Sequence, residues 1–201
     1  MNKKLLALYG LKYNPFSSEV PVEGLYSHQT LENFCWRIEH VLLTEGGFAL
    51  VSGEPGTGKS VTLRLIADHL KNIRDVQIGT ITHPSAKDAD FYHELGDIIG
   101  VVLNTNNRWS GFKSLRERWL SHLQGTLLRP VLFIDEAQEV PVAVLSELRM
   151  LTSMNFDSRI LLSVILAGDQ RLNSLLRRDE LLPLGSRIKV RFNTEYAPVE
   201  Q

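Results

Sequence analysis

Two short stretches of the sequence place lysine, serine and carboxylate side chains at spacings that suit phosphate chemistry. The first covers residues 53–60 and reads Gly-Glu-Pro-Gly-Thr-Gly-Lys-Ser. It fits the phosphate-loop pattern G-x-x-x-x-G-K-[ST], in which inward-pointing backbone amides form a concavity for anions. We therefore predict that a nucleotide's phosphates are bound by Gly53, Glu54, Pro55, Gly56, Thr57, Gly58, Lys59, Ser60 and Val61.

Within this stretch each residue type has its own task. The glycines allow the backbone to turn sharply and to approach a ligand closely. Lys59 supplies a mobile positive charge for the β- and γ-phosphates of ATP or ADP, and Ser60 supplies a hydroxyl for Mg²⁺, which prefers oxygen ligands. A chance glycine-rich turn is the alternative. The flanking pattern argues against it, because 48–52 is typical of a buried strand and 61–70 of a helix.

The second stretch is Val131-Leu132-Phe133-Ile134-Asp135-Glu136. Four consecutive apolar residues predict a strand buried on both faces. Two carboxylates at its end cost free energy of desolvation, which indicates that they have a function there. This matches the Walker B pattern. We predict that Asp135 helps to hold Mg²⁺ and that Glu136 polarises the attacking water. The alternative is that the two carboxylates only cap the next helix.

The elements that must position these residues alternate between strand and helix. Strands are predicted at 48–52, 75–82, 131–134, 160–167 and 186–192, and helices at 28–44, 61–70, 88–99, 112–128, 141–152 and 170–178, with a break at 182–185. Such alternation predicts an α/β fold, a three-layer αβα sandwich with about five largely parallel strands. The spacing favours an additional strand between the phosphate-loop strand and the strand that ends in Asp135. The strand at 186–192 alternates apolar and polar residues, which is typical of an edge.

The whole chain sets broader limits. Its 201 residues, 43% hydrophobic and 22% charged, fit one soluble globular domain. The net charge of −1 gives no general signal for nucleic acid or membrane. No secretory signal, bilayer-spanning run or metal-type histidine spacing is visible, so we expect a cytoplasmic protein without a membrane partner. The single cysteine, Cys35, is predicted to be a buried structural thiol.

Two features have two readings each. Asp169 follows the apolar strand at 160–167, where it can touch the γ-phosphate or the water as a sensor, or cap the next helix. Both roles are compatible. Residues 1–30 mix aromatics with breakers and are predicted to lie along the domain surface, with Phe16 and Tyr26 as anchors. This segment either lines the base side of the nucleotide pocket or only packs there.

Several segments together resemble the ExeA (general secretion pathway protein A) type of AAA+ ATPase, and the transposition ATPases TniB, TnsC and MuB are similar. The resemblance covers nearly the whole chain and rests on Tyr9-Gly10-Leu11, Asn14-Pro15-Phe16, Leu25-Tyr26-Ser27-His28, the loop at 53–60, and Leu166-Ala167-Gly168 with Leu172. It implies a P-loop NTPase with an AAA+ core at 31–192, a lead-in at 1–30 and a tail at 193–201. The usual helical lid is expected to be absent, which puts rapid turnover in doubt.

The resemblance also implies roles for single residues. Asp169 matches the sensor-1 position, where the family commonly has Gln. Arg187 matches the arginine finger, which reaches the γ-phosphate of a neighbouring subunit and so implies a homo-oligomer, a ring or a filament. Arg177 and Arg178 are rivals for this role, and a plain surface arginine is the alternative.

Three functions are compatible with this sequence. The first is a DNA-associated accessory ATPase of a mobile element, with double-stranded DNA and a transposase as partners. The second is an ATPase of secretion-system assembly, and the third is a nucleotide-binding module with little turnover. Candidates for DNA contact are Arg108, Trp109, Lys113, Arg116 and Arg118, and the alternative is that they form a solvated helix face.

Overall fold

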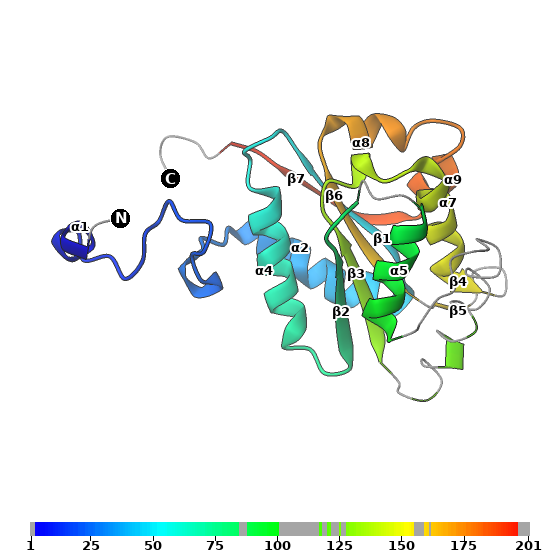
Figure 1. The fold of residues 1–201 in the computed structure, drawn as a ribbon, viewed down its shortest axis with the longest axis horizontal. Coiled ribbons are helices and arrows are strands. Elements are labelled where there is room, and N and C mark those ends of the chain that lie inside the picture. The colour runs from blue at the N-terminus through cyan, green and yellow to red at the C-terminus, as the bar shows by residue number, and fades with distance from the viewer. Residues whose placement is uncertain are drawn as a thin grey trace.

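A five-stranded parallel sheet with the order β2-β3-β6-β1-β7 forms the centre of the fold (Figure 1). The computed structural model describes residues 3–84, 88–100, 128–154, 159–160 and 162–196, together with 117, 120, 121 and 125. The five strands are β1 Gly47–Gly53, β2 Val76–Ile81, β3 Arg129–Ile134, β6 Ser163–Gly168 and β7 Ile188–Thr194. This confirms the predicted α/β architecture and the edge position of the last strand.

Helices cover both faces of this sheet. One face carries α2 (Gln29–Arg37) and α4 (Lys59–Lys71), and the other carries α5 (Asp88–Ile99) and α7 (Val142–Leu151) (Figure 1). Each face has its own apolar cluster, since successive strand residues point to opposite sides of the sheet. Shorter elements are α1 Lys3–Leu8, η1 Val22–Gly24, α3 Leu43–Glu45, η3 Ala137–Glu139, β4 Ser153–Met154, β5 Arg159–Ile160, α8 Gln170–Leu175 and α9 Leu182–Gly185.

Strand β6 lies between β1 and β3, as the spacing of the motifs predicts. Ser52 pairs with Gly168, and Leu166 pairs with Ile134. Because the strands are parallel, their carboxyl ends meet at one edge of the sheet. The phosphate loop after β1, the carboxylates after β3 and Asp169 after β6 therefore share that edge.

The start of one strand and the nature of one break differ from their predictions. The strand predicted from residue 160 begins only at Ser163, because Arg159–Ile160 pair antiparallel with Ser153–Met154. An apolar run shows that a segment is buried but not with which strand it pairs. The predicted break at Leu182–Gly185 is a short helix, α9, because proline in a first helical turn gives up an amide that has no intrahelical acceptor.

The predicted helix at 28–44 is confirmed as a helical segment, but it is not one regular helix. It consists of α2, a π-helical turn over Ile38–Leu42 and α3. The wider turn lets Ile38, Leu42 and Leu43 all face the core, where they are 0%, 0% and 5% exposed. The predicted helix at 112–128 and the turn at 155–158 lie outside or almost outside the described residues.

The lead-in is attached differently from the prediction. Phe16 and Tyr26 are 89% and 71% exposed, so neither anchors the segment by burial. Val20 is buried instead, and the guanidinium of Arg64 on α4 donates to the carbonyls of Ser18 at 3.0 Å and Val20 at 2.5 Å. Helix α1 lies apart from the body of the molecule (Figure 1). Among the helices that the structure describes, none is long and apolar enough to cross a membrane.

The predicted burial of Cys35 is confirmed, since its side chain packs within the α2 side of the core. Burial, with a smaller contribution from the charge of Glu32, raises the pKa of the Cys35 thiol to about 11. A thiol of this kind is almost wholly protonated at neutral pH and therefore unreactive.

Candidate functional site

The phosphate loop joins the end of β1 to the start of α4. Gly56 and Gly58 have φ values of 85° and 91°, in the left-handed region that glycine adopts without steric cost. A Cβ on either glycine would meet no atom within 4 Å, so open space lies beside this part of the loop. Helix α4 begins at Lys59 and directs its amino end, with the positive end of its dipole, towards the same space.

Lys59 lies under this loop rather than in solvent. Its residue is only 7% exposed, and its Nζ donates to the carbonyls of Gly53 and Glu54, both at 3.1 Å. Both acceptors are neutral backbone groups. The ammonium group is thus held at the loop by uncharged partners. Phosphate oxygens can replace these carbonyls, and they bind the ammonium group more strongly because they are charged.

The two residues predicted to hold Mg²⁺ lie side by side, although they are far apart in the sequence. The hydroxyl of Ser60 donates to Oδ2 of Asp135 at 2.7 Å. The other carboxylate oxygen, Oδ1, accepts from the backbone amide of Glu136 at 2.9 Å. A hydroxyl and a carboxylate in contact at the mouth of a phosphate loop are a donor set that fits Mg²⁺, which usually takes one or two protein oxygens together with phosphates and waters.

Glu136 occupies an unusual backbone conformation beside this pair. Its φ of 49° and ψ of 42° place it in the left-handed region, which a residue with a side chain adopts only when its surroundings require it. Its carboxylate oxygen Oε2 accepts a hydrogen bond from the side-chain amide of Gln138. Gln138 is not among the residues predicted from the sequence, although a glutamine two residues after the paired carboxylates is a visible signal.

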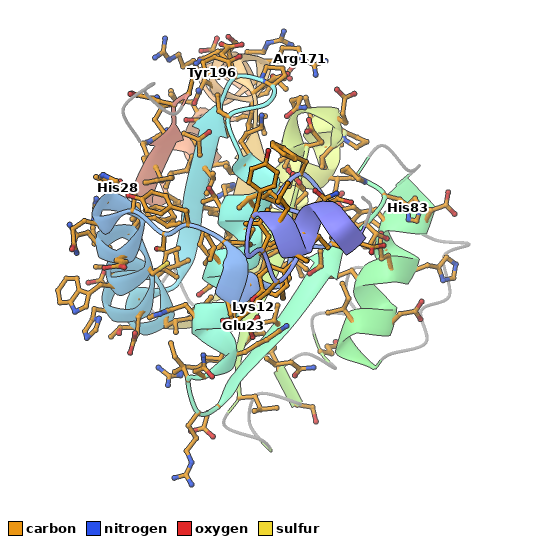
Figure 2. All side chains as sticks on the ribbon, turned by 90° about the vertical axis from the view of Figure 1, so that its left-hand side faces the viewer. Lys12, Glu23, His28, His83, Arg171 and Tyr196 are labelled. Carbon is orange, nitrogen blue, oxygen red and sulfur yellow. The ribbon has the colours of Figure 1, made fainter. Side chains whose placement is uncertain are left out.

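Asp169 caps helix α8, as one of its two predicted roles requires. Its Oδ1 accepts from the backbone amide of Arg171 at 2.8 Å, and its Oδ2 accepts from Nε of Arg171 at 2.9 Å. Arg171 also pairs with Glu139 at 2.9 Å, and it is labelled at the top of Figure 2. The sensor role of Asp169 stays a prediction.

These contacts also set the charge of the Asp169 carboxyl group. Partial desolvation favours its neutral form. The hydrogen bonds from Arg171 outweigh that effect, and the charges of Arg171 and Lys59 act in the same direction, so the pKa of Asp169 lies below its usual value. Asp169 therefore carries its negative charge at neutral pH. Because both carboxylate oxygens of Asp169 bond to Arg171, this charge acts at the amino end of helix α8.

Residues at and just after the carboxyl end of β7 hold the phosphate loop by hydrogen bonds. The hydroxyls of Thr57 and Thr194 are 2.6 Å apart, and the hydroxyl of Tyr196 donates to the carbonyl of Pro55 at 3.0 Å. Gly53 lies so close to this strand that an added Cβ would be 2.0 Å from Oγ1 and 2.6 Å from the carbonyl oxygen of Thr194. The loop's position therefore depends on β7, whose end lies two residues beyond the predicted strand.

Gly53→Ala is expected to lower the free energy of unfolding by about 1–3 kcal/mol, because the new methyl group must displace the backbone of β7. Nucleotide affinity should fall as well, since the same displacement moves the loop. Thermal unfolding and binding of a fluorescent ADP analogue measure the two effects. Gly125→Ala is the matched control, because nothing lies within 4 Å of its added Cβ. Equal stability of the two variants would contradict this account.

A cavity of about 580 Å³ opens beside the loop and has room for a nucleoside. Its walls combine the loop and α4 with the lead-in and the end of β7, and they are formed by Tyr26, His28, Thr30, Leu31, Gly56, Thr57, Gly58, Val61, Thr62, Leu65, Phe192, Asn193, Thr194, Glu195 and Tyr196. Figure 2 shows His28 and Tyr196 in the same view. Tyr26 and His28 of the lead-in line this cavity. They therefore support the prediction that the lead-in lines the base side of the nucleotide pocket.

Arg187 lies at the opposite end of the sheet from the phosphate loop. Its carbonyl accepts from the amide of Phe48 at the start of β1, whereas Gly53 pairs with Thr194 at the end. Phe48 and Gly53 are five residue steps apart along β1, which corresponds to about 17 Å. Arg187 therefore does not complete the site of its own chain, and its predicted role as a finger in a neighbouring copy stays a prediction. The rivals, Arg177 and Arg178, are exposed after α8. The five predicted DNA-contact residues lie outside the described part of the chain.

The chain is similar to known proteins over most of its length. Residues 42–176 match the family model described as "AAA domain". General secretion pathway protein A of Aeromonas hydrophila is 31% identical over 188 residues, which cover 92% of this chain and 34% of that protein. This chain therefore spans about a third of the length of that relative.

Solved structures with the same fold include Cdc6p from Pyrobaculum aerophilum, with a TM-score of 0.68, 17% identity, and coverage of 90% of this chain and 48% of that one. The ORC1 protein of Aeropyrum pernix in complex with DNA has a TM-score of 0.61 and 18% identity, covering 92% of this chain and 49% of that one. At such low identities these similarities establish the fold alone. They agree with the α/β P-loop NTPase architecture described above.

Proposed function

Since this chain belongs to the AAA domain family, we propose that it binds ATP with Mg²⁺ at residues 53–60 and hydrolyses it. The observation that carries the proposal is the contact between Ser60 and Asp135 at 2.7 Å, because Ser60 follows Lys59, whose ammonium group bonds to the loop's carbonyls. An oxygen pair for a metal ion, a positive charge and open loop amides therefore converge on one point at the carboxyl edge of the sheet.

The proposed reaction assigns a separate role to each group. Lys59 and the loop amides bind and orient the β- and γ-phosphates. Bound Mg²⁺ neutralises charge on the phosphates, and Ser60 and Asp135 would hold it. Glu136 accepts the proton of the attacking water as a general base. The cavity lined by Tyr26 and His28 receives the base and the ribose.

At the level of the cellular process, we propose that this ATPase serves the assembly of a secretion system. Support comes from the similarity to general secretion pathway protein A, which spans 92% of this chain and includes the phosphate loop. The action of Arg187 on the site of a neighbouring copy belongs to the same proposal. It is supported by the position of Arg187 at the sheet end opposite its own loop.

The reading as a DNA-associated transposition ATPase has no comparable support, because the relatives described above include no transposition protein. The reading as a binding module with little turnover is disfavoured by Glu136, a carboxylate residue whose backbone amide bonds to Asp135 of the proposed metal pair. Measurements of ATP hydrolysis with and without DNA and Mg²⁺ distinguish these two alternatives from the proposed Mg²⁺-dependent ATPase.

The purified chain is expected to hydrolyse ATP with Mg²⁺ and to lose this activity when EDTA removes the metal. Addition of double-stranded DNA at low salt, where phosphate contacts are strongest, should change the rate by less than about twofold. Phosphate release in the three conditions measures these effects. Strong stimulation and retention of DNA would instead support the transposition reading. Nucleotide binding without Mg²⁺-dependent phosphate release would leave the binding module as the correct reading.

A further inference from the structure

Gln138 connects the ends of two neighbouring strands at the proposed site. It lies in the 3₁₀ turn η3, one turn after β3, and it is a buried polar residue with an exposed fraction of 8%. Its side-chain amide contacts the Glu136 carboxylate on one side. On the other side its Oε1 accepts from the backbone amide of Asp169 at 3.3 Å, at the end of β6.

The chemistry of its two partners fixes the orientation of this amide. The Asp169 backbone N–H can only donate, so the oxygen of Gln138 must face it. The NH₂ group of Gln138 must then face Glu136, whose carboxylate oxygen Oε2 accepts its hydrogen bond. Both ends of the side chain are therefore matched, and reversing the amide would lose both hydrogen bonds.

The surrounding backbone is shaped to allow this contact. A Cβ on Gly168 would lie 2.4 Å from Oε1 of Gln138 and 2.7 Å from Cδ2 of Leu172, so any larger residue would push the amide away. Ala137, on the other side, is fully buried and holds the turn against the core. The left-handed backbone of Glu136 places carboxylate oxygen Oε2 against the Gln138 amide, while the residue as a whole stays exposed to solvent.

We infer that Gln138 is a positioning residue that holds one oxygen of the Glu136 carboxylate and leaves the other oxygen for the attacking water. This inference rests on the proposed ATP hydrolysis. A general base contributes its full effect only when it is held within reach of the proton that it takes. By bonding to the Asp169 amide as well, Gln138 fixes Glu136 relative to β6, the strand between β3 and the phosphate-loop strand.

Four proteins test this inference by a double-mutant cycle: wild type, Gln138→Leu, Glu136→Gln and the double variant. Gln138→Leu is expected to lower kcat by about 10–100-fold, because a displaced base loses most of its effect. The dissociation constant for a fluorescent ADP analogue should stay within about twofold, since Gln138 does not line the nucleotide cavity. In the Glu136→Gln background the leucine should cause no further loss, because residues that act as one unit are not additive.

Gln138→Glu separates the two ends of the side chain. It keeps an oxygen for the Asp169 amide but cannot donate to Glu136 at pH 8. Its kcat should therefore fall as in Gln138→Leu, while hydrogen exchange of the Asp169 amide stays slow. In Gln138→Leu that amide should exchange about tenfold faster, which corresponds to one lost hydrogen bond. Gln77→Leu, in β2 at the amino end of the sheet, controls for the chemical change.

Several results would overturn the inference. These are a wild-type or raised kcat in Gln138→Leu, a further loss in the Glu136→Gln background, or a parallel loss of ADP affinity and melting temperature. Unchanged exchange at Asp169 would remove the structural basis as well. If the wild type itself releases no phosphate with Mg²⁺, the proposed function fails, and the exchange experiment still decides whether Gln138 bonds to Asp169.

Discussion

Replacing Glu136 by glutamine is expected to reduce ATP hydrolysis by about 10²–10⁴-fold, the usual contribution of a general base. The substitution keeps the size of the side chain but removes the group that accepts the proton from water. Nucleotide affinity should stay within about twofold, because Lys59 and the loop amides bind the phosphates and are unchanged. Single-turnover phosphate release and titration with a fluorescent ADP analogue measure the two quantities.

Glu180→Gln is the matched control for this substitution, because Glu180 is exposed in the turn before α9, away from the loop. Its rate should equal that of the wild type. If Glu136→Gln also keeps the wild-type rate, another group activates the water. In that case the contact between Glu136 and Gln138 has only a structural role.

Replacing Lys59 by alanine is expected to weaken nucleotide binding by about 10²–10³-fold, or about 3–4 kcal/mol. The ammonium group is nearly buried and bonds to the carbonyls of Gly53 and Glu54 in the phosphate loop. Its loss removes the positive side chain of the loop and leaves the phosphates to the backbone dipoles and to bound Mg²⁺. Isothermal titration with ATP and ADP measures the change.

Lys71→Ala is the control for Lys59→Ala. Lys71 is the exposed last residue of the same helix, and its substitution removes the same charge from the chain. Its affinity should be that of the wild type. A loss of less than threefold in Lys59→Ala would contradict the assigned binding site. The melting temperature of both variants without nucleotide separates lost binding from lost folding.

Much of the site can be predicted from the sequence because its chemistry lies in contiguous motifs. The loop at 53–60 and the pair Asp135 and Glu136 contain their residue types at fixed spacing, and the rule for parallel strands brings their ends together. The apolar runs of β1, β3 and β6 are long enough to identify buried strands. Their order in the sheet then follows from the motifs that they carry.

The remaining features depend on contacts between distant segments, which spacing does not encode. The bond from Gln138 to the Asp169 amide requires the register between β3 and β6, and the bond from Tyr196 to Pro55 requires the register of β7. The anchors of the lead-in are wrongly predicted for a related reason. Aromatic character favours burial, but Phe16 is exposed and the buried residue is Val20. Burial is decided by which neighbours are present.

The sheet order has a consequence for the synthesis of this protein. Strand β1 is synthesised early, but its partners, β6 at 163–168 and β7 at 188–194, are synthesised after all the other strands of the five-stranded sheet. Until then the apolar segment Phe48–Val51, which is buried in the folded protein, has no neighbouring strand. We expect its exposed apolar side chains to be bound by chaperones. Because β7 and Tyr196 also fasten the phosphate loop, we expect a nascent chain to bind no nucleotide until residue 196 has emerged. ATP is therefore expected to stabilise only chains in which β7 has already taken its place beside β1.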